Sequence, residues 1–107
     1  TDLYRAVTGI EISQSELRQA GERIWNLQRA FNQREGADRK DDMPPWRTLH
    51  EPLQVGDREF PPITGEKASK LLDEYYEERG WNTKDGRLTR EQLVALDLGE
   101  VASDLGL

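Results

Sequence analysis

The sequence contains no cysteine among its 107 residues. A disulfide bond is therefore excluded, and so is any thiolate ligand for a metal ion or an iron–sulfur cluster. No stretch approaches the ~20 apolar residues that a membrane-spanning helix requires, and no apolar run has the form of a signal peptide. These absences favour a cytoplasmic protein that makes no contact with a membrane.

Clustered positive charge is also lacking. The chain has 15 basic and 21 acidic residues, a net charge of −6, and its basic residues are scattered among the acids. Binding to nucleic acid phosphates or to an anionic lipid surface requires a concentrated basic face. Nucleic acid and membrane are therefore excluded as partners.

Residues with obvious catalytic chemistry are few. His50 is the only histidine, and metal ligands normally occur in clusters, so we expect a surface or packing histidine. The glycines are isolated, which excludes a phosphate-binding loop, and no Ser–His–Asp set has local support. The sequence therefore predicts no catalytic and no metal-binding residue, and it leaves any cofactor-binding residues unknown.

Residues 81–92 resemble a calcium-binding loop between two helices, with Gly86 at the turn position. Calcium loops place oxygen ligands at the first and the twelfth position. Here Trp81 and Gln92 occupy those positions. The pattern therefore favours a Lys-Asp-Gly turn that leads into a capped helix.

The strongest helix signal covers residues 14–32. Ser13 and Glu16 have the spacing of a capping box, in which each side chain bonds to the backbone of the other. Apolar residues then recur every three or four positions, which predicts one buried stripe along the helix. The residues of this stripe are Leu17, Ala20, Ile24, Leu27 and Phe31.

Other segments also favour helix. Residues 1–8 resemble the last turns of a helix that ends at Gly9, which suggests further sequence upstream, although Thr1 could also follow a removed initiator methionine. Thr64 is placed to cap a helix over residues 66–79, and Gly80 to end it. Thr89 begins a further helix, followed by a last short turn.

All five prolines fall between residues 37 and 63. Because proline fixes φ and removes a hydrogen-bond donor, we expect no helix there, only an extended arm packed on a surface. The predicted fold class is therefore all-α, with three to four helices and a long proline-rich extended arm between the second and third. The length allows one domain, residues 1–107.

Two further groups have structural and functional interpretations. Trp25, Trp46 and Trp81, with Tyr75 and Tyr76, could stack bases or sugars, but aromatic residues on helices usually lie in a core. Asp41 and Asp42 could act as paired carboxylates. A turn cap, or an ion pair with Arg39 or Arg47, is the more common role.

Several motifs, in colinear order over nearly the whole chain, resemble one family, the tungsten-containing aldehyde ferredoxin oxidoreductases. The main segments are TGIEI (8–12), GERIWNL (21–27), RAFNQREG (29–36), RKDDMPPW (39–46), LDEYY (72–76) and RGW (79–81). The resemblance is to the helical C-terminal part of these enzymes. The most informative run is residues 22–46, a helix that stops at Gly36 and continues through the acidic turn into two prolines.

The resemblance implies a parent enzyme that holds a tungsten (or molybdenum) bis-pterin cofactor and one [4Fe–4S] cluster. Such enzymes oxidise aldehydes to carboxylic acids and pass the electrons to ferredoxin. No catalytic or ligand residue of the family can be assigned to a numbered position here. We expect the segment to hold no cofactor itself and to pack against the remaining domains of the parent.

Two hypotheses follow. In the first, the chain is a structural, non-catalytic part of such an oxidoreductase, in which Arg34, Asp41 and Asp42 form an ion network that fixes the proline-rich arm. In the second, it is a stand-alone helical module that binds another protein through an exposed apolar groove. The coding sequence upstream of Thr1 would distinguish them.

Overall fold

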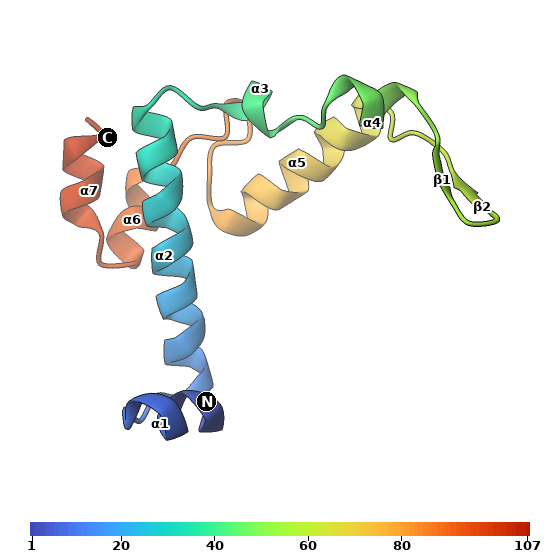
Figure 1. Cartoon of the computed structure of the whole chain (residues 1–107). Helices are drawn as coiled ribbons and strands as arrows, with labels where there is room; N and C mark the ends of the chain where they lie inside the picture. Colours follow the sequence, from blue (N-terminus) through green and yellow to red (C-terminus); the bar gives the residue numbers. More distant parts are fainter. The chain divides into compact units, whose positions relative to one another are not determined.

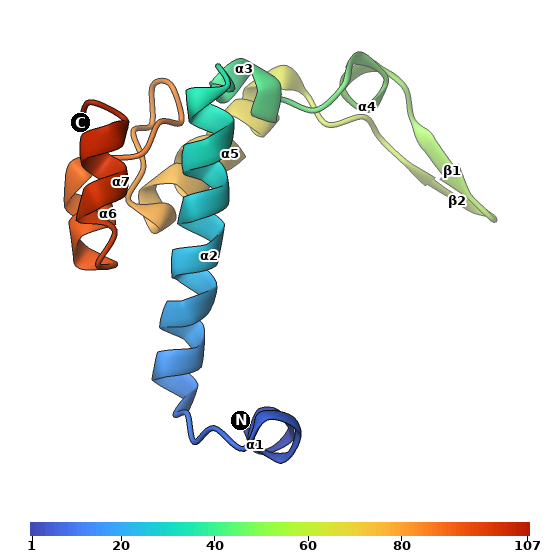
Figure 2. The same cartoon turned by 60° about the vertical axis from the view of Figure 1, so that its left-hand side comes forward.

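The computed structural model describes all residues, 1–107. The chain forms two compact units. The first unit comprises residues 1–35 and 88–107, and the second comprises residues 36–87. No helix combines the length and the apolar content needed to cross a lipid bilayer. Figures 1 and 2 show the elements of both units in two views.

The first unit is helical. Its elements are α1 (Asp2–Thr8), α2 (Gln14–Arg34), α6 (Arg90–Ala95) and α7 (Gly99–Asp104). Gly9 ends α1 in the left-handed conformation, and Ser13 and Glu16 form the expected capping box at the start of α2. The predictions for both helices are confirmed, with α2 extended by two residues to Arg34.

Polar contacts join α2 to the C-terminal segment of the same unit. The guanidinium of Arg23 donates to the backbone oxygen of Leu96 at 2.9 Å. The side-chain oxygen of Gln33, which is buried, accepts the backbone N–H of Leu88 at 2.8 Å. Leu93 and Ala102 are fully buried. The interior of this unit therefore contains amide side chains of α2 as well as apolar side chains of α6 and α7.

The second unit contains α3 (Arg39–Asp42), α4 (Trp46–His50), β1 (Leu53–Val55), β2 (Arg58–Phe60) and α5 (Gly65–Arg79). The two strands pair antiparallel, with Leu53 opposite Phe60 and Val55 opposite Arg58. As predicted, Thr64 caps α5 and Gly80 ends it in the left-handed conformation. Ala68 and Tyr76 of α5 and Trp81 beyond it are buried.

The prediction of an all-α fold with three to four helices is wrong. The chain has seven helices and a two-stranded antiparallel sheet, and α3, α4 and the sheet all lie in the segment predicted to be a helix-free arm. Pro45 occupies the N-cap of α4, a position where a missing N–H costs nothing. Gly56 has φ +59° and, with Asp57, makes a two-residue hairpin turn.

Candidate functional site

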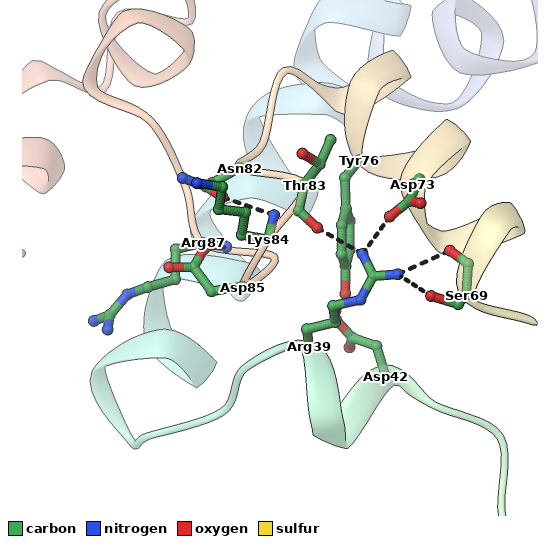
Figure 3. Close-up of polar contacts among 10 residues, drawn as sticks. All are labelled: Arg39, Asp42, Ser69, Asp73, Tyr76, Asn82, Thr83, Lys84, Asp85 and Arg87. Atoms are coloured by element: carbon green, nitrogen blue, oxygen red, sulfur yellow. Dashed lines mark hydrogen bonds and ion pairs between the residues drawn. The ribbon is translucent and has the colours of Figure 1, made fainter. Parts of the chain in front are cut away.

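Arg39 is the centre of a polar cluster in the second unit (Figure 3). Its guanidinium lies 2.7 Å from a carboxylate oxygen of Asp73. It also donates to the backbone oxygen of Thr83 at 2.6 Å, and to both the backbone and the hydroxyl oxygen of Ser69 at 2.8 Å. We call these four residues the Arg39 clamp. Charge-assisted bonds of this kind are about twice as strong as neutral ones.

The backbone of α3 is also hydrogen-bonded to the loop that follows α5. The N–H of Arg39 donates to the backbone oxygen of Asp85 at 2.8 Å. At the N-terminus of α3, Asp38 and Asp41 form a capping box, so the first turn of this four-residue helix is closed by its own side chains. The clamp therefore holds a helix that is too short to be stable by itself.

The ring of Tyr76 lies against the guanidinium of Arg39. The Tyr76 side chain is fully buried, the Arg39 guanidinium lies 5.4 Å from the ring centroid, and the Tyr76 hydroxyl donates to a carboxylate oxygen of Asp42. Trp81 packs at 6.0 Å from the Tyr76 ring and, edge to face, at 5.7 Å from Tyr75. Tyr76 and Trp81 are buried, in agreement with the core interpretation, whereas Trp25 and Trp46 are 45% and 65% exposed, contrary to it.

The loop after α5 forms the turn expected from its sequence. The side chain of Asn82 accepts the N–H of Lys84, and that of Asp85 accepts the N–H of Arg87. Gly86 has φ +69°, and Thr89 caps α6. The Lys-Asp-Gly turn is therefore confirmed. It presents the backbone oxygen of Thr83 to the clamp, as Figure 3 shows.

The proposed ion network around Arg34 takes a different form. Arg34 pairs with its neighbour Glu35 at 3.4 Å, and its guanidinium lies over the Phe31 ring. Asp41 caps α3, and Asp42 accepts a hydrogen bond from the Tyr76 hydroxyl. Capping was the preferred interpretation of Asp41 and is confirmed. The clamp partners Ser69, Asp73 and Thr83 were missed, since no local pattern links them to Arg39.

His50 and Arg47 have local partners on α4. The His50 ring stacks on Trp46 with centroids 4.6 Å apart, and its Nδ1 lies 2.8 Å from the backbone oxygen of Trp46. Arg47 pairs with Glu51 at 2.8 Å. The interpretation of His50 as a packing histidine is consistent with this geometry.

The apolar stripe of α2 is exposed, contrary to expectation. Ile24 exposes 68% of its surface and Phe31 56%, whereas Asn26 and Gln33 are buried. Because an α-helix advances about 100° per residue, these two amides lie roughly 180–200° around the helix from Ile24. The helix therefore packs through a face that contains Asn26, Ala30 and Gln33, and it exposes most of its predicted apolar stripe.

The residues present do not fit a metal centre of the implied kind. A [4Fe–4S] cluster requires thiolate ligands, and the chain has no cysteine. No group of three or more histidine, aspartate or glutamate side chains is placed to hold a metal ion. The geometry supports packing and positioning, so no chemical step is assigned to these residues.

Comparison with known proteins shows where such a fold occurs. Residues 1–98 match the family model described as aldehyde ferredoxin oxidoreductase, domains 2 and 3. In solved structures, the fold resembles a chain of the active-site complex BamBC of benzoyl coenzyme A reductase in complex with 1,5-dienoyl-CoA. The TM-score is 0.72 at 38% identity, over 94% of this chain and 14% of that chain. The class is thus a helical domain segment of large oxidoreductases.

Curated relatives agree with this class. The chain is 39% identical over 101 residues to the tungsten-containing aldehyde ferredoxin oxidoreductase of Pyrococcus horikoshii, and 36% identical over 100 residues to that of Pyrococcus furiosus. The matches cover 94% and 92% of this chain but 16% of each relative. The chain belongs to the aldehyde ferredoxin oxidoreductase family, and it spans about one sixth of the length of these relatives.

Proposed function

We propose that the chain is the helical C-terminal part of a tungstopterin and iron–sulfur oxidoreductase, and that its role there is structural. The parent enzyme oxidises aldehydes to carboxylic acids and uses ferredoxin as electron acceptor. The pterin-bound metal, tungsten or molybdenum, and the [4Fe–4S] cluster are held by the other domains. This chain completes the wall around them in the cytoplasmic enzyme.

The observation that carries the proposal is the reversed polarity of α2. A long helix that buries Asn26 and Gln33 and exposes Ile24 and Phe31 leaves apolar surface in water. Burial of a large apolar side chain contributes about 1.5–3 kcal/mol. Covering this face with another surface would stabilise the protein, and the relatives, of which the matched segment is 16%, have further chain to do so.

The α2 face can be tested in the longer enzyme. Ile24→Ser with Phe31→Ser should lower its melting temperature, since each removes about 2–4 kcal/mol of packing. Arg18→Ser with Asn32→Ser changes exposed polar positions elsewhere on the helix and serves as the control, with little effect expected. Equal melting temperatures for the two double variants would refute the packing role.

The catalytic part of the proposal has its own test. The longer enzyme should oxidise aldehydes with ferredoxin as acceptor, and its purified form should contain tungsten or molybdenum together with iron. An enzyme without aldehyde-dependent ferredoxin reduction would refute the assigned reaction while leaving the packing role intact.

The second candidate is a stand-alone module that binds a partner helix. A cavity of about 230 Å³ between α2 and α7, lined by Leu27, Phe31 and Val101 among others, favours it, because such a concavity can accept apolar side chains of a partner. A native protein of 107 residues would support this candidate. A native polypeptide several times longer would support the oxidoreductase.

A further inference from the structure

The hairpin formed by β1 and β2 extends from α4 within the second unit, as both cartoon views show (Figures 1 and 2). All six strand residues are exposed. An isolated two-stranded hairpin is marginally stable at best in water. This hairpin therefore needs support from a further surface to hold a fixed conformation.

The register divides the hairpin into two faces. Leu53 pairs with Phe60 and Val55 with Arg58, so these four side chains lie on one face. Gln54 and Glu59 pair on the opposite face. The first face exposes 62% of Leu53, 56% of Val55 and 46% of Phe60. One side of the hairpin is thus apolar with a single cation at its tip, and the other side is polar.

The apolar face continues into a cavity. Leu53 and Phe60 also line a hollow of about 700 Å³. Its other walls come from α4, from Glu51 and Pro52, from Pro61, Pro62 and Ile63, and from Lys67 on α5. A volume of this size exceeds that of any one side chain and is within the range of well-formed binding pockets. The face and the cavity together form one continuous recess.

We propose that this recess is a docking site for another region of the same, longer polypeptide. The inference rests on the proposed function. The curated relatives extend far beyond the matched segment, which is 16% of their length, so chain is available to fill the site. The occupant presents apolar side chains to Leu53 and Phe60, and a carboxylate to Arg58.

Site-specific cross-linking in the longer enzyme tests this directly. Benzoylphenylalanine replaces Phe60 in one variant, and Glu59 on the opposite face in the matched control. After irradiation, peptide mapping by mass spectrometry should find the Phe60 probe joined to a region of the same polypeptide outside these 107 residues. The Glu59 probe should give at least five-fold less of that product.

Three results would overturn the proposal: equal yields from the two probes, a product joining two copies of the chain, or a product with a different protein. The aldehyde oxidation assay is a separate experiment whose outcome does not depend on these results. Failure of the docking site is therefore distinguishable from failure of the proposed function. A 107-residue native protein would instead refute the proposed function itself.

Limited proteolysis gives a second measurement that does not need the probe. In the longer enzyme, Leu53→Ser with Phe60→Ser should speed tryptic cleavage after Arg58 about ten-fold, because the undocked hairpin becomes accessible. Gln54→Ser with Glu59→Ser should leave the rate unchanged. Equal cleavage rates in the two double variants would contradict docking through the apolar face.

Discussion

The guanidinium of Arg39 lies 2.7 Å from the carboxylate of Asp73 and simultaneously bonds the backbone oxygens of Ser69 and Thr83. This one side chain ties α3 to α5 and to the loop beyond it. The Arg39 side chain is only 17% exposed, whereas Asp73 is 50% exposed. The clamp therefore combines a largely desolvated cation with a solvated anion, and its backbone contacts carry much of its strength.

Replacement of the clamp arginine should destabilise the second unit. Arg39→Met keeps most of the aliphatic bulk but removes every polar contact, so the free energy of unfolding should fall by about 2–3 kcal/mol. Arg47→Met is the control: Arg47 is 85% exposed and pairs only within its own helix turn, so about 0–0.5 kcal/mol is expected. Urea denaturation followed by circular dichroism measures both. Equal losses would show that the clamp is no more than a surface ion pair.

Asp42 and Tyr76 should behave as one unit. Tyr76→Phe removes the buried hydroxyl that donates to Asp42, and Asp42→Ala removes the acceptor. Each should cost about 1–3 kcal/mol and lower the melting temperature, because either change removes the hydrogen bond between the Tyr76 hydroxyl and the Asp42 carboxylate. A double-mutant cycle should show coupling of about 1 kcal/mol or more. Additive losses would mean that the two residues act independently.

Gln33 should be more important than a typical helix glutamine. Gln33→Met leaves the buried N–H of Leu88 without its acceptor, which should destabilise the first unit by about 1–3 kcal/mol. Gln28→Met, at an exposed position of the same helix, should change stability by less than about 0.5 kcal/mol. Thermal unfolding of the two variants makes the comparison. No difference between them would remove the role assigned to Gln33.

The start of α2 should lose stability in acid. The backbone N–H of Ser13, followed by its hydroxyl, donates to the Glu16 carboxylate and holds the pKa of Glu16 below its usual value of 4.5. Because the pKa is lower in the folded chain than in the unfolded chain, the ionised carboxylate stabilises the fold at any pH above the unfolded-state pKa. This contribution is lost as the pH falls through the folded-state pKa.

An NMR titration of the Glu16 carboxyl group measures this pKa. Ser13→Ala should raise it only in part, since the backbone bond of residue 13 remains. Glu16→Gln should remove this part of the acid dependence of helicity, because glutamine does not titrate. Glutamine can still form the capping box with Ser13. A pKa of Glu16 at or above 4.5 in the wild-type chain would contradict the capping geometry.

Local features were predictable from sequence because their causes are local. The Ser13–Glu16 capping box, the Thr64 and Thr89 caps, and the glycine stops at Gly9 and Gly80 each depend on residues within one turn. The β-hairpin also had a local signal, a Gly56-Asp57 turn between alternating residues, but the density of prolines around it obscured that signal.

The clamp and the burial of α2 could not be predicted in the same way. Arg39 contacts Ser69, Asp73 and Thr83 across a long stretch of chain, and no spacing rule connects them. On α2, the periodic apolar stripe correctly indicated a helix but not which face is buried within this chain. Within this chain α2 buries Asn26 and Gln33, and the proposed covering surface would account for the exposed apolar stripe.

We propose that this chain is a structural part of a much larger tungsten or molybdenum oxidoreductase. The most direct measurement is the mass and metal content of the native protein that carries these residues, purified from its source and identified by peptides spanning Arg39 to Tyr76. We predict one polypeptide several times longer than 107 residues, containing iron together with tungsten or molybdenum. A native protein of 12.3 kDa would contradict the claim.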